Sequence, residues 1–258
     1  MGIINATPDS FYAKSRQQKV SSAIEIASKM INDGVEILDI GGYSSRPNAE
    51  NISIDEEMSR VLPIIEGIKL NFPNQLISID TFRTRVANAA IQSGADIIND
   101  ITGGYNNQSI YQLAAREKTP YIMMHMKGTP QSMQKETTYG SLIGDIISFF
   151  SNQIKLAKSS GLKDIILDPG IGFSKTIDQN FKIIKELKSL QILNHPILIG
   201  ISRKSLIYKT LNIKPEESLN ATTSLNSVCL LNGAKIIRVH DVKEASETIA
   251  IFKKINNL

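Results

Sequence analysis

The feature that most constrains this fold is the alternation of eight short apolar runs, rich in β-branched residues, with longer amphipathic stretches. The runs are largely uninterrupted in apolar character, which is typical of parallel strands buried on both faces. In the stretches 20–31 and 181–190, apolar residues recur at a spacing that predicts amphipathic helices. The predicted strands are 2–5, 35–40, 76–80, 96–99, 120–125, 165–168, 196–200 and 235–239.

A glycine precedes every second predicted strand. Gly34, Gly94, Gly161 and Gly233 each follow a helical stretch, where helices commonly stop in a left-handed conformation. Eight strand–helix units in 258 residues fit a closed (β/α)₈ barrel. A doubly wound open sheet is the structural alternative. No linker interrupts the pattern, so we expect residues 1–258 to form a single barrel domain.

Composition excludes several classes of protein. With 41% apolar and 21% charged residues, the chain is too apolar to be disordered. Its 29 basic and 25 acidic residues are dispersed, which argues against a nucleic-acid partner and permits a small anionic substrate. Neither a membrane span nor a secretory signal is expected. The one cysteine, Cys229, lies in an apolar run and is expected to be buried, which fits a cytoplasmic protein.

Polar residues stand at the carboxyl ends of the predicted strands. In a (β/α)₈ barrel, catalytic groups lie at this end. Asp80, Asn99 and Asp168 end the third, fourth and sixth strands. Two carboxylates at one rim can form an acid–base pair, coordinate a metal, or accept paired N–H groups from an aminopterin or guanine-like ring. Cations follow the last two strands, at the usual phosphate site of this barrel: Arg203, Lys204, Arg238 and His240. The sequence predicts a pocket shared by a heterocycle and an anion.

The longest loops, 6–19 and 42–53, follow the first and second strands and are interpreted as lids. Phe11 and Arg46 are their anchors. Asp39 is interpreted as orienting Arg46 or a neighbouring loop.

The histidines and methionines have simpler interpretations. His195 is expected to be structural, whereas His125 either lines the pocket or packs in the interior. Three histidines in separate loops form no zinc motif. Among Met123, Met124 and Met126, at least one should lie in the core, and one of the last two should form an apolar wall of the pocket.

Eight segments resemble dihydropteroate synthases and occur in that family's order along nearly the whole chain. They are 1–11, 39–47, 78–81, 98–104, 124–128, 167–173, 200–205 and 238–240, with sequences such as Asp-Ile-Gly-Gly-Tyr-Ser-Ser-Arg-Pro, Leu-Asp-Pro-Gly-Ile-Gly-Phe and Gly-Ile-Ser-Arg-Lys-Ser. Such a set is far more specific than a lone glycine-rich loop.

The resemblance implies a transferase of folate biosynthesis with the barrel fold, usually a homodimer. It implies the condensation of 4-aminobenzoate with 6-hydroxymethyl-7,8-dihydropterin diphosphate to 7,8-dihydropteroate and diphosphate, with Mg²⁺ as cofactor. By motif, Asn5 would contact the metal, and Asp80, Asn99, Asp168 and Lys204 would hold the pterin. Arg238 and His240 would hold the diphosphate, Phe173, Lys204 and Ser205 would line the aminobenzoate site, and Phe11 and Pro47 would close over it. Ser45, Arg46 and Val239 would also contact the substrates.

Combined with the charges of the pocket, the resemblance implies a Mg²⁺-assisted dissociative substitution at the pterin methylene. The expected catalytic residues are Asp80 and Asp168, which stabilise positive charge on the ring, and Lys204, Arg238 and His240, of which the last two stabilise the leaving diphosphate with the metal. The alternatives are a pterin-dependent methyltransferase, which would not need the cationic cluster, and a catalytically silent pterin-binding barrel.

Two departures from the family pattern affect packing. Ser45 stands where the family usually has threonine, so we expect looser packing beside the aminobenzoate. The barrel is also expected to be shortened before its first strand, with a less well covered lower end. Whether Asp9 also reaches the metal stays open.

Overall fold

The computed structural model describes residues 1–6, 16–44, 51–105, 107–129 and 131–257, and it contains all eight predicted strands. Each strand begins and ends within two residues of its predicted bounds. The strands are β1 (Gly2–Asn5), β2 (Ile37–Gly41), β3 (Leu76–Asp80), β4 (Ile97–Asp100), β5 (Tyr121–Met124), β6 (Ile165–Asp168), β7 (Leu198–Ile199) and β8 (Ile236–Ile237).

The strands pair in parallel and in chain order. β1 to β6 form one sheet, and β7 pairs with β8. Two parallel bridges join the six-stranded sheet to the β7–β8 pair, one at each edge. They connect Leu167 with Ile197 and Val239 with Gly2. At the second seam the amide of Ile3 donates to the carbonyl of Val239 at 3.0 Å. The strands therefore form a ring of parallel neighbours, which is the predicted (β/α)₈ barrel and excludes the open sheet.

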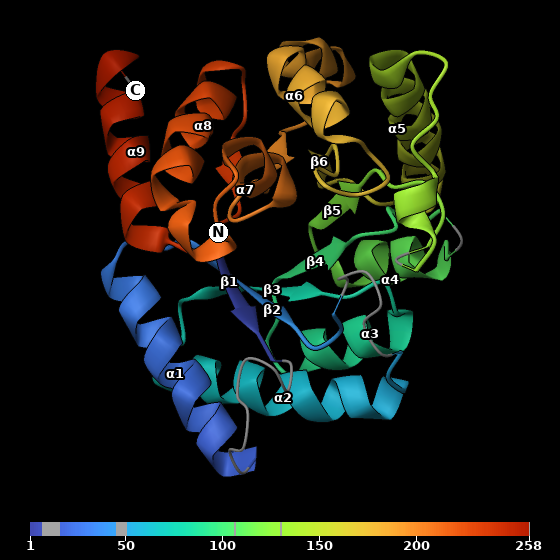
Figure 1. Ribbon diagram of the computed structural model, residues 1–258. Coiled ribbons are helices and arrows are strands. Elements are labelled where there is room, and N and C mark those ends of the chain that lie inside the picture. The colour runs from blue at the N-terminus through green and yellow to red at the C-terminus, as the bar shows by residue number, and fades with distance from the viewer. Residues whose placement is uncertain (7–15, 45–50, 106, 130, 258) are drawn as a thin grey trace.

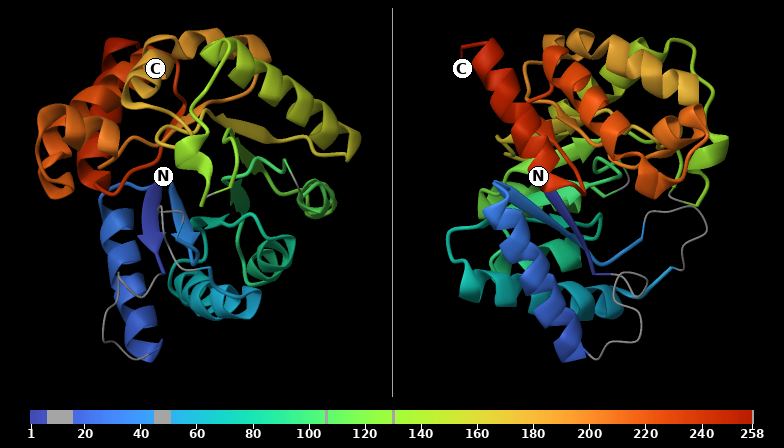
Figure 2. Two further views of the ribbon diagram at one scale, coloured as in Figure 1. Left: turned by 45° about the vertical axis from the view of Figure 1, so that its right-hand side comes forward. Right: turned by 60° about the vertical axis from the view of Figure 1, so that its left-hand side comes forward.

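Helices surround the strands on the outside, as three directions of view show (Figures 1 and 2). They are α1 (Arg16–Asn32), α2 (Ile54–Asn71), α3 (Thr84–Gln92), α4 (Ser109–Glu117), α5 (Leu142–Ser159), α6 (Ile177–Lys185), α7 (Ser205–Leu211), α8 (Leu219–Leu231) and α9 (Val242–Ile255). The four glycines that precede the even-numbered strands have φ angles of 88° to 109°, which confirms the left-handed helix ends.

The predicted helix 181–190 is wrong in its second half. α6 ends at Lys185, and a 3₁₀ helix follows over Leu187–Leu193. Leu187 and Leu190 are both fully buried. Their spacing of three residues equals one turn of a 3₁₀ helix, so this geometry turns both side chains toward the core.

The inside of the barrel is apolar at its lower end and polar at its mouth. A buried cluster at the lower end consists of Ile97, Ile122 and Leu198, packed with Met1, Ile37, Ile166 and Ile236. Strand side chains alternate between the two faces. On each of six strands, the residue two positions after the cluster member therefore also faces inward and lies nearer the mouth. These residues are Asp39, Asn99, Met124, Asp168, Gly200 and Arg238. This alternation places the predicted site directly above the apolar cluster.

Candidate active site

Strand register sets three predicted site residues in one row at the mouth. Asn5 on β1 is opposite Gly41 on β2, which is opposite Asp80 on β3, which is opposite Asn99 on β4. A Cβ atom on Gly41 would lie 3.5 Å from the Cβ of Asp80, so the glycine leaves room for the carboxylate. The backbone thus aligns the predicted metal residue with two predicted pterin residues.

Arg238 lies between two carboxylates. Its Nε donates to Oδ2 of Asp39 at 2.6 Å, and its Nη2 donates to Oδ2 of Asp80 at 2.8 Å. The side-chain amide of Asn99 donates to the same oxygen of Asp39 at 3.1 Å. The Asp39 side chain is fully buried, and those of Arg238 and Asp80 are each 20% exposed. One buried cation therefore compensates the charges of two carboxylates.

From the sequence, Asp39 was expected to orient Arg46 or a neighbouring loop, and its ion pair with Arg238 was not predicted. Asp39 holds Arg238 and Asn99 in place, and Arg46 lies outside the described residues. The alternation of side chains along β2 was the signal that could have revealed it, since Asp39 shares the inward face with Ile37.

Burial controls the ionisation of Asp80. Desolvation raises the pKa of its carboxyl group to about 7, and Arg238 opposes this shift by attraction. Repulsion from Asp39, Glu57 and Asp100 raises the pKa further. Asp80 is therefore a carboxyl group that exchanges its proton near neutral pH.

Asp168 lies at the end of β6, opposite Met124 on β5. Its Oδ1 accepts the backbone N–H of Gly170 at 2.8 Å, and the residue is buried. Burial raises the pKa of Asp168, whereas the charge of Lys204 and the bond from Gly170 oppose the rise. Asp80 and Asp168 thus reach the same mouth from different strands.

Lys204 lies close to Phe173, and Ser205 follows Lys204 in the chain. Nζ of Lys204 donates to the carbonyl of Ile171 at 2.6 Å and lies 4.9 Å from the centre of the Phe173 ring. Burial lowers the pKa of Lys204 to about 8, against the attraction of Asp168. Ser205 is half-buried as the first residue of α7.

His240 is oriented by Ser202, which the sequence analysis did not single out. Its Nδ1 lies 3.0 Å from Oγ of Ser202, and its amide donates to that oxygen at 3.2 Å. Burial lowers the pKa of His240 to about 4, so the ring is neutral at pH 7. We assign Nδ1 as the acceptor of the hydroxyl proton, which leaves Nε2–H as a donor.

Two neighbours in the cationic segments turn away from the mouth. Arg203 is 38% exposed and pairs with Asp241. Val239 is buried in the main core, and its backbone N–H and carbonyl both bond to the β1 segment. The structure therefore brings Lys204 and Arg238 to the pocket but gives Val239 a place in the barrel wall.

Apolar side chains line the mouth beside β5. The buried cluster Ile101, Met124, Met126 and Met133 packs against Phe82 and Phe173, whereas Met123 joins the main core. His125 packs at 4.9 Å from Phe149 between ring centres, and burial lowers its pKa to about 2. Of the two alternatives for His125, the structure favours the packed, neutral ring. Nδ1 of His195 lies 3.2 Å from the carbonyl of Ile165 at the lower end.

The predicted residues on the two lids lie outside the described residues. These are Phe11, Ser45, Arg46 and Pro47, together with Asp9. The stems of the second lid, residues 42–44 and 51–53, are described.

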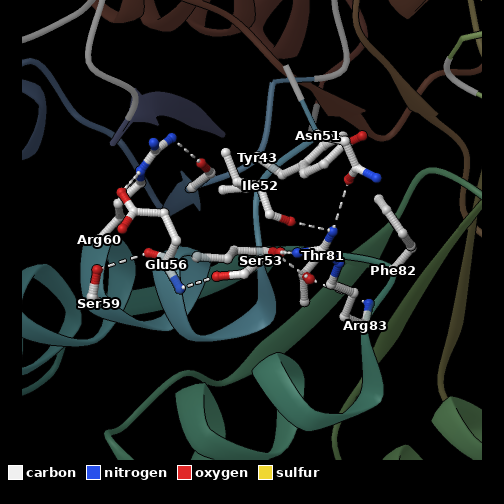
Figure 3. A network of polar contacts seen from close by, with 12 residues as sticks. Tyr43, Asn51, Ile52, Ser53, Glu56, Ser59, Arg60, Thr81, Phe82 and Arg83 are labelled. Atoms are coloured by element: carbon white, nitrogen blue, oxygen red, sulfur yellow. Dashed lines mark hydrogen bonds and ion pairs between the residues drawn. The ribbon is translucent and has the colours of Figure 1, made fainter. Parts of the chain in front are cut away.

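Arg83 connects both stems of the second lid to β3 (Figure 3). Its Nη2 donates to the carbonyl of Ile52 at 2.8 Å, and its guanidinium lies 5.1 Å from the centre of the Tyr43 ring. Its Nη1 donates to the buried Glu57 at 2.9 Å. The hydroxyl of Thr81, next to Asp80, donates to the other oxygen of Glu57 at 2.6 Å. The network therefore ties the described stems of this loop to the strand that ends in Asp80.

A cavity of about 530 Å³ opens beside this network. Its lining includes Tyr43, Phe82, Arg83, Tyr105 and Met126. Its described lining contains none of the predicted pterin residues. The cavity is therefore adjacent to the predicted pocket rather than part of it.

Residues 1–240 match the family described as pterin binding enzyme. A dihydropteroate synthase from Synechocystis is 45% identical over 252 residues, which are 96% of this chain and 86% of that protein. This chain belongs to the dihydropteroate synthase family.

Solved structures of dihydropteroate synthases have the same fold. An enzyme from Clostridium difficile, crystallised in the presence of pteroic acid, has a TM-score of 0.92 and 35% identity, covering 99% of this chain and 95% of that one. One from Xanthomonas albilineans, with 4-aminobenzoic acid, has a TM-score of 0.92 and 29% identity, covering 100% and 93%. In the described part of this chain, every helix is too short or too polar to traverse a bilayer.

Proposed function

We propose that this chain transfers the dihydropterinylmethyl group of 6-hydroxymethyl-7,8-dihydropterin diphosphate to 4-aminobenzoate, forming 7,8-dihydropteroate in folate biosynthesis. The observation that carries the proposal is the convergence of Asp80, Asn99 and Asp168 with Lys204 and His240 at one mouth of the barrel. The related structures with pteroic acid and 4-aminobenzoic acid support the choice of substrates.

The acidic side of the mouth suits the pterin. Carboxylate oxygens of Asp80 and Asp168 can accept N–H groups from the ring, and Asn99 offers a carbonyl oxygen beside them. Two carboxylates also stabilise positive charge that spreads over the ring as the bond from the methylene carbon to oxygen breaks. The arylamine is neutral at pH 7, so its attack needs no strong general base.

The cationic side suits the leaving diphosphate. Nη1 of Arg238 has no hydrogen-bond partner among the described residues, because the two carboxylates engage only Nε and Nη2. The assigned Nε2–H of the neutral His240 is a second donor. Donors already fixed by Asp39, Asp80 and Ser202 lose little freedom when they stabilise the developing negative charge.

The donor chemistry at the mouth fits Mg²⁺ bound mainly through the substrate. The described residues contain no cluster of three carboxylate, histidine or cysteine ligands. Mg²⁺ usually takes one or two protein oxygens and completes its shell with phosphates and water. The amide oxygen of Asn5 at the end of β1 is such a ligand. When bound, the ion would neutralise charge on the diphosphate.

Diphosphate release tests the proposal directly. Purified protein is expected to release diphosphate and form 7,8-dihydropteroate only when both substrates are present, and chelation with EDTA should reduce the rate by at least about tenfold. Chromatography of the pterin products distinguishes synthesis from hydrolysis of the diphosphate substrate. Pterin binding without any product would favour the silent barrel and contradict the proposal.

Pterin affinity is expected to depend on the ionisation of Asp80. Its pKa is raised to about 7, and only the ionised form accepts N–H groups through both oxygens. Affinity for 6-hydroxymethyl-7,8-dihydropterin, measured by calorimetry, should therefore fall as the pH drops below 7, approaching about tenfold per pH unit. Asp80→Asn should bind weakly without this acid limb. An equally steep limb in Asp80→Asn would assign it to another group.

Two further features are part of the proposal. We propose a homodimer, as the family resemblance implies, and exposed apolar side chains on α8 and α9 support it, namely Leu231, Ile251 and Ile255. We also propose a cytoplasmic location, which the buried, unpaired Cys229 supports.

A further inference from the structure

The turn between β6 and α6 wraps around one buried ammonium group. Nζ of Lys175 lies 3.0 Å from the carbonyl oxygen of Gly170, 2.9 Å from that of Phe173 and 3.3 Å from that of His125. Lys175 is only 5% exposed. Burying an ammonium group is strongly unfavourable unless acceptors surround it, so three converging carbonyls indicate a specific arrangement.

A fourth acceptor completes the surroundings of this lysine. Nδ1 of His125 lies 3.1 Å from Nζ, and the neutral ring allows that nitrogen to present its lone pair. Each of the three ammonium protons therefore has an acceptor. Burial lowers the pKa of Lys175 to about 7, while Asp168 attracts the charge and Lys204 and Lys127 repel it.

The same carbonyls tie the turn to the end of β5. Gly170 has φ of 71°, and a Cβ atom there would lie 2.0 Å from the carbonyl oxygen of His125. Only glycine permits this approach. Lys175 bonds to both carbonyls at the contact, so it holds the turn against β5.

Two bonds lead from the turn into the predicted pocket. The N–H of Gly170 donates to Asp168, and the carbonyl of Ile171 accepts the ammonium of Lys204. Gly170 and Ile171 both lie in the turn that surrounds the Lys175 ammonium group. The position of the Asp168 carboxylate therefore depends on the conformation that Lys175 imposes on Gly170.

We propose that Lys175 is a positioning residue of the pterin pocket, acting on Asp168 through the backbone of Gly170. The inference rests on the proposed function, because it assigns Asp168 to the pterin. Lys175 itself makes none of the predicted substrate contacts.

A double-mutant cycle separates positioning from simple stabilisation. Lys175→Met should weaken binding of 6-hydroxymethyl-7,8-dihydropterin about tenfold, measured by calorimetry at a temperature where the variant is fully folded. In an Asp168→Ala background the same substitution should change the affinity by less than about twofold. In an Asn99→Ala background the tenfold effect should persist, because Asn99 lies on β4 and its side chain bonds to Asp39 rather than to the turn.

Lys127→Met is the matched control. Lys127 is two residues from His125 and also donates to a backbone carbonyl, that of Thr138 at 2.7 Å, but it has no bond to the turn carbonyls. The Lys127→Met variant should bind 6-hydroxymethyl-7,8-dihydropterin with the same affinity as the parent protein. If Lys175→Met does not fold, Lys175→Gln takes its place in the same cycle.

The possible failures are distinguishable. Parental affinity in the folded Lys175 variant, or a tenfold loss that persists without Asp168, would overturn the inference and leave the proposed function intact. A parent protein that neither binds the pterin nor forms product would overturn the proposed function.

Discussion

Arg238→Met is expected to reduce dihydropteroate formation by at least about 100-fold and to lower the free energy of unfolding by about 3–5 kcal/mol. The substitution leaves Asp39 fully buried and Asp80 largely buried without their cation. It also removes a predicted donor to the diphosphate. Since Arg238 lowers the pKa of Asp80, its loss should raise that pKa further and move the acid limb of pterin binding to higher pH.

Arg203→Met is the control for this prediction. Arg203 also follows one of the last two strands, but it is 38% exposed and pairs with Asp241 outside the pocket. Its loss should cost less than about 1 kcal/mol and leave product formation near the parental rate. Urea unfolding and diphosphate release measure both effects. Equal effects of the two substitutions would show that the buried ion pairs of Arg238 have no special role.

Arg83→Met is expected to lower the free energy of unfolding by about 3–5 kcal/mol, because it leaves the buried carboxylate of Glu57 without its cation. Arg85→Met, two residues away, should change it by less than about 0.5 kcal/mol, since both Arg85 and its partner Asp55 are mostly exposed. Urea unfolding of the two variants provides a matched comparison at the start of one helix, where Arg83 is the N-cap of α3 and Arg85 lies in its first turn.

The pH dependence gives this prediction a second test. Burial raises the pKa of Glu57, and Arg83 opposes that rise, so the substitution should raise it further. A raised carboxyl pKa favours the folded state only while the proton is bound. The destabilisation by Arg83→Met should therefore be larger at pH 8 than at pH 5. A destabilisation independent of pH would exclude the uncompensated carboxylate as its cause.

The pattern of apolar residues made most of the barrel predictable from the sequence. Short apolar runs and the glycines before every second strand located the strands within two residues. The convergence of Asp80, Asn99, Asp168 and Lys204 followed from a general property of the fold, since parallel strands end at one rim.

Long-range pairing explains what the sequence did not reveal. Asp39 and Arg238 are 199 residues apart, and their contact depends on the seam that brings β8 beside β1, the neighbour of β2. The sequence analysis did not single out Lys175, because the carbonyls that surround it are backbone atoms with no signature in the sequence. Partner choice among charged groups is a tertiary property, which residue spacing alone does not determine.

The apolar cluster of Ile97, Ile122 and Leu198 closes the lower end of the barrel. Among the described residues, these side chains fill the barrel below the carboxylates. Substrates and products therefore enter and leave through the upper end. A substrate that lies beneath the other must then bind first, and after the reaction the two leave joined as one product. Ordered binding of the two substrates would then follow from the packing at the lower end of the barrel. It would not require any loop at the mouth to move.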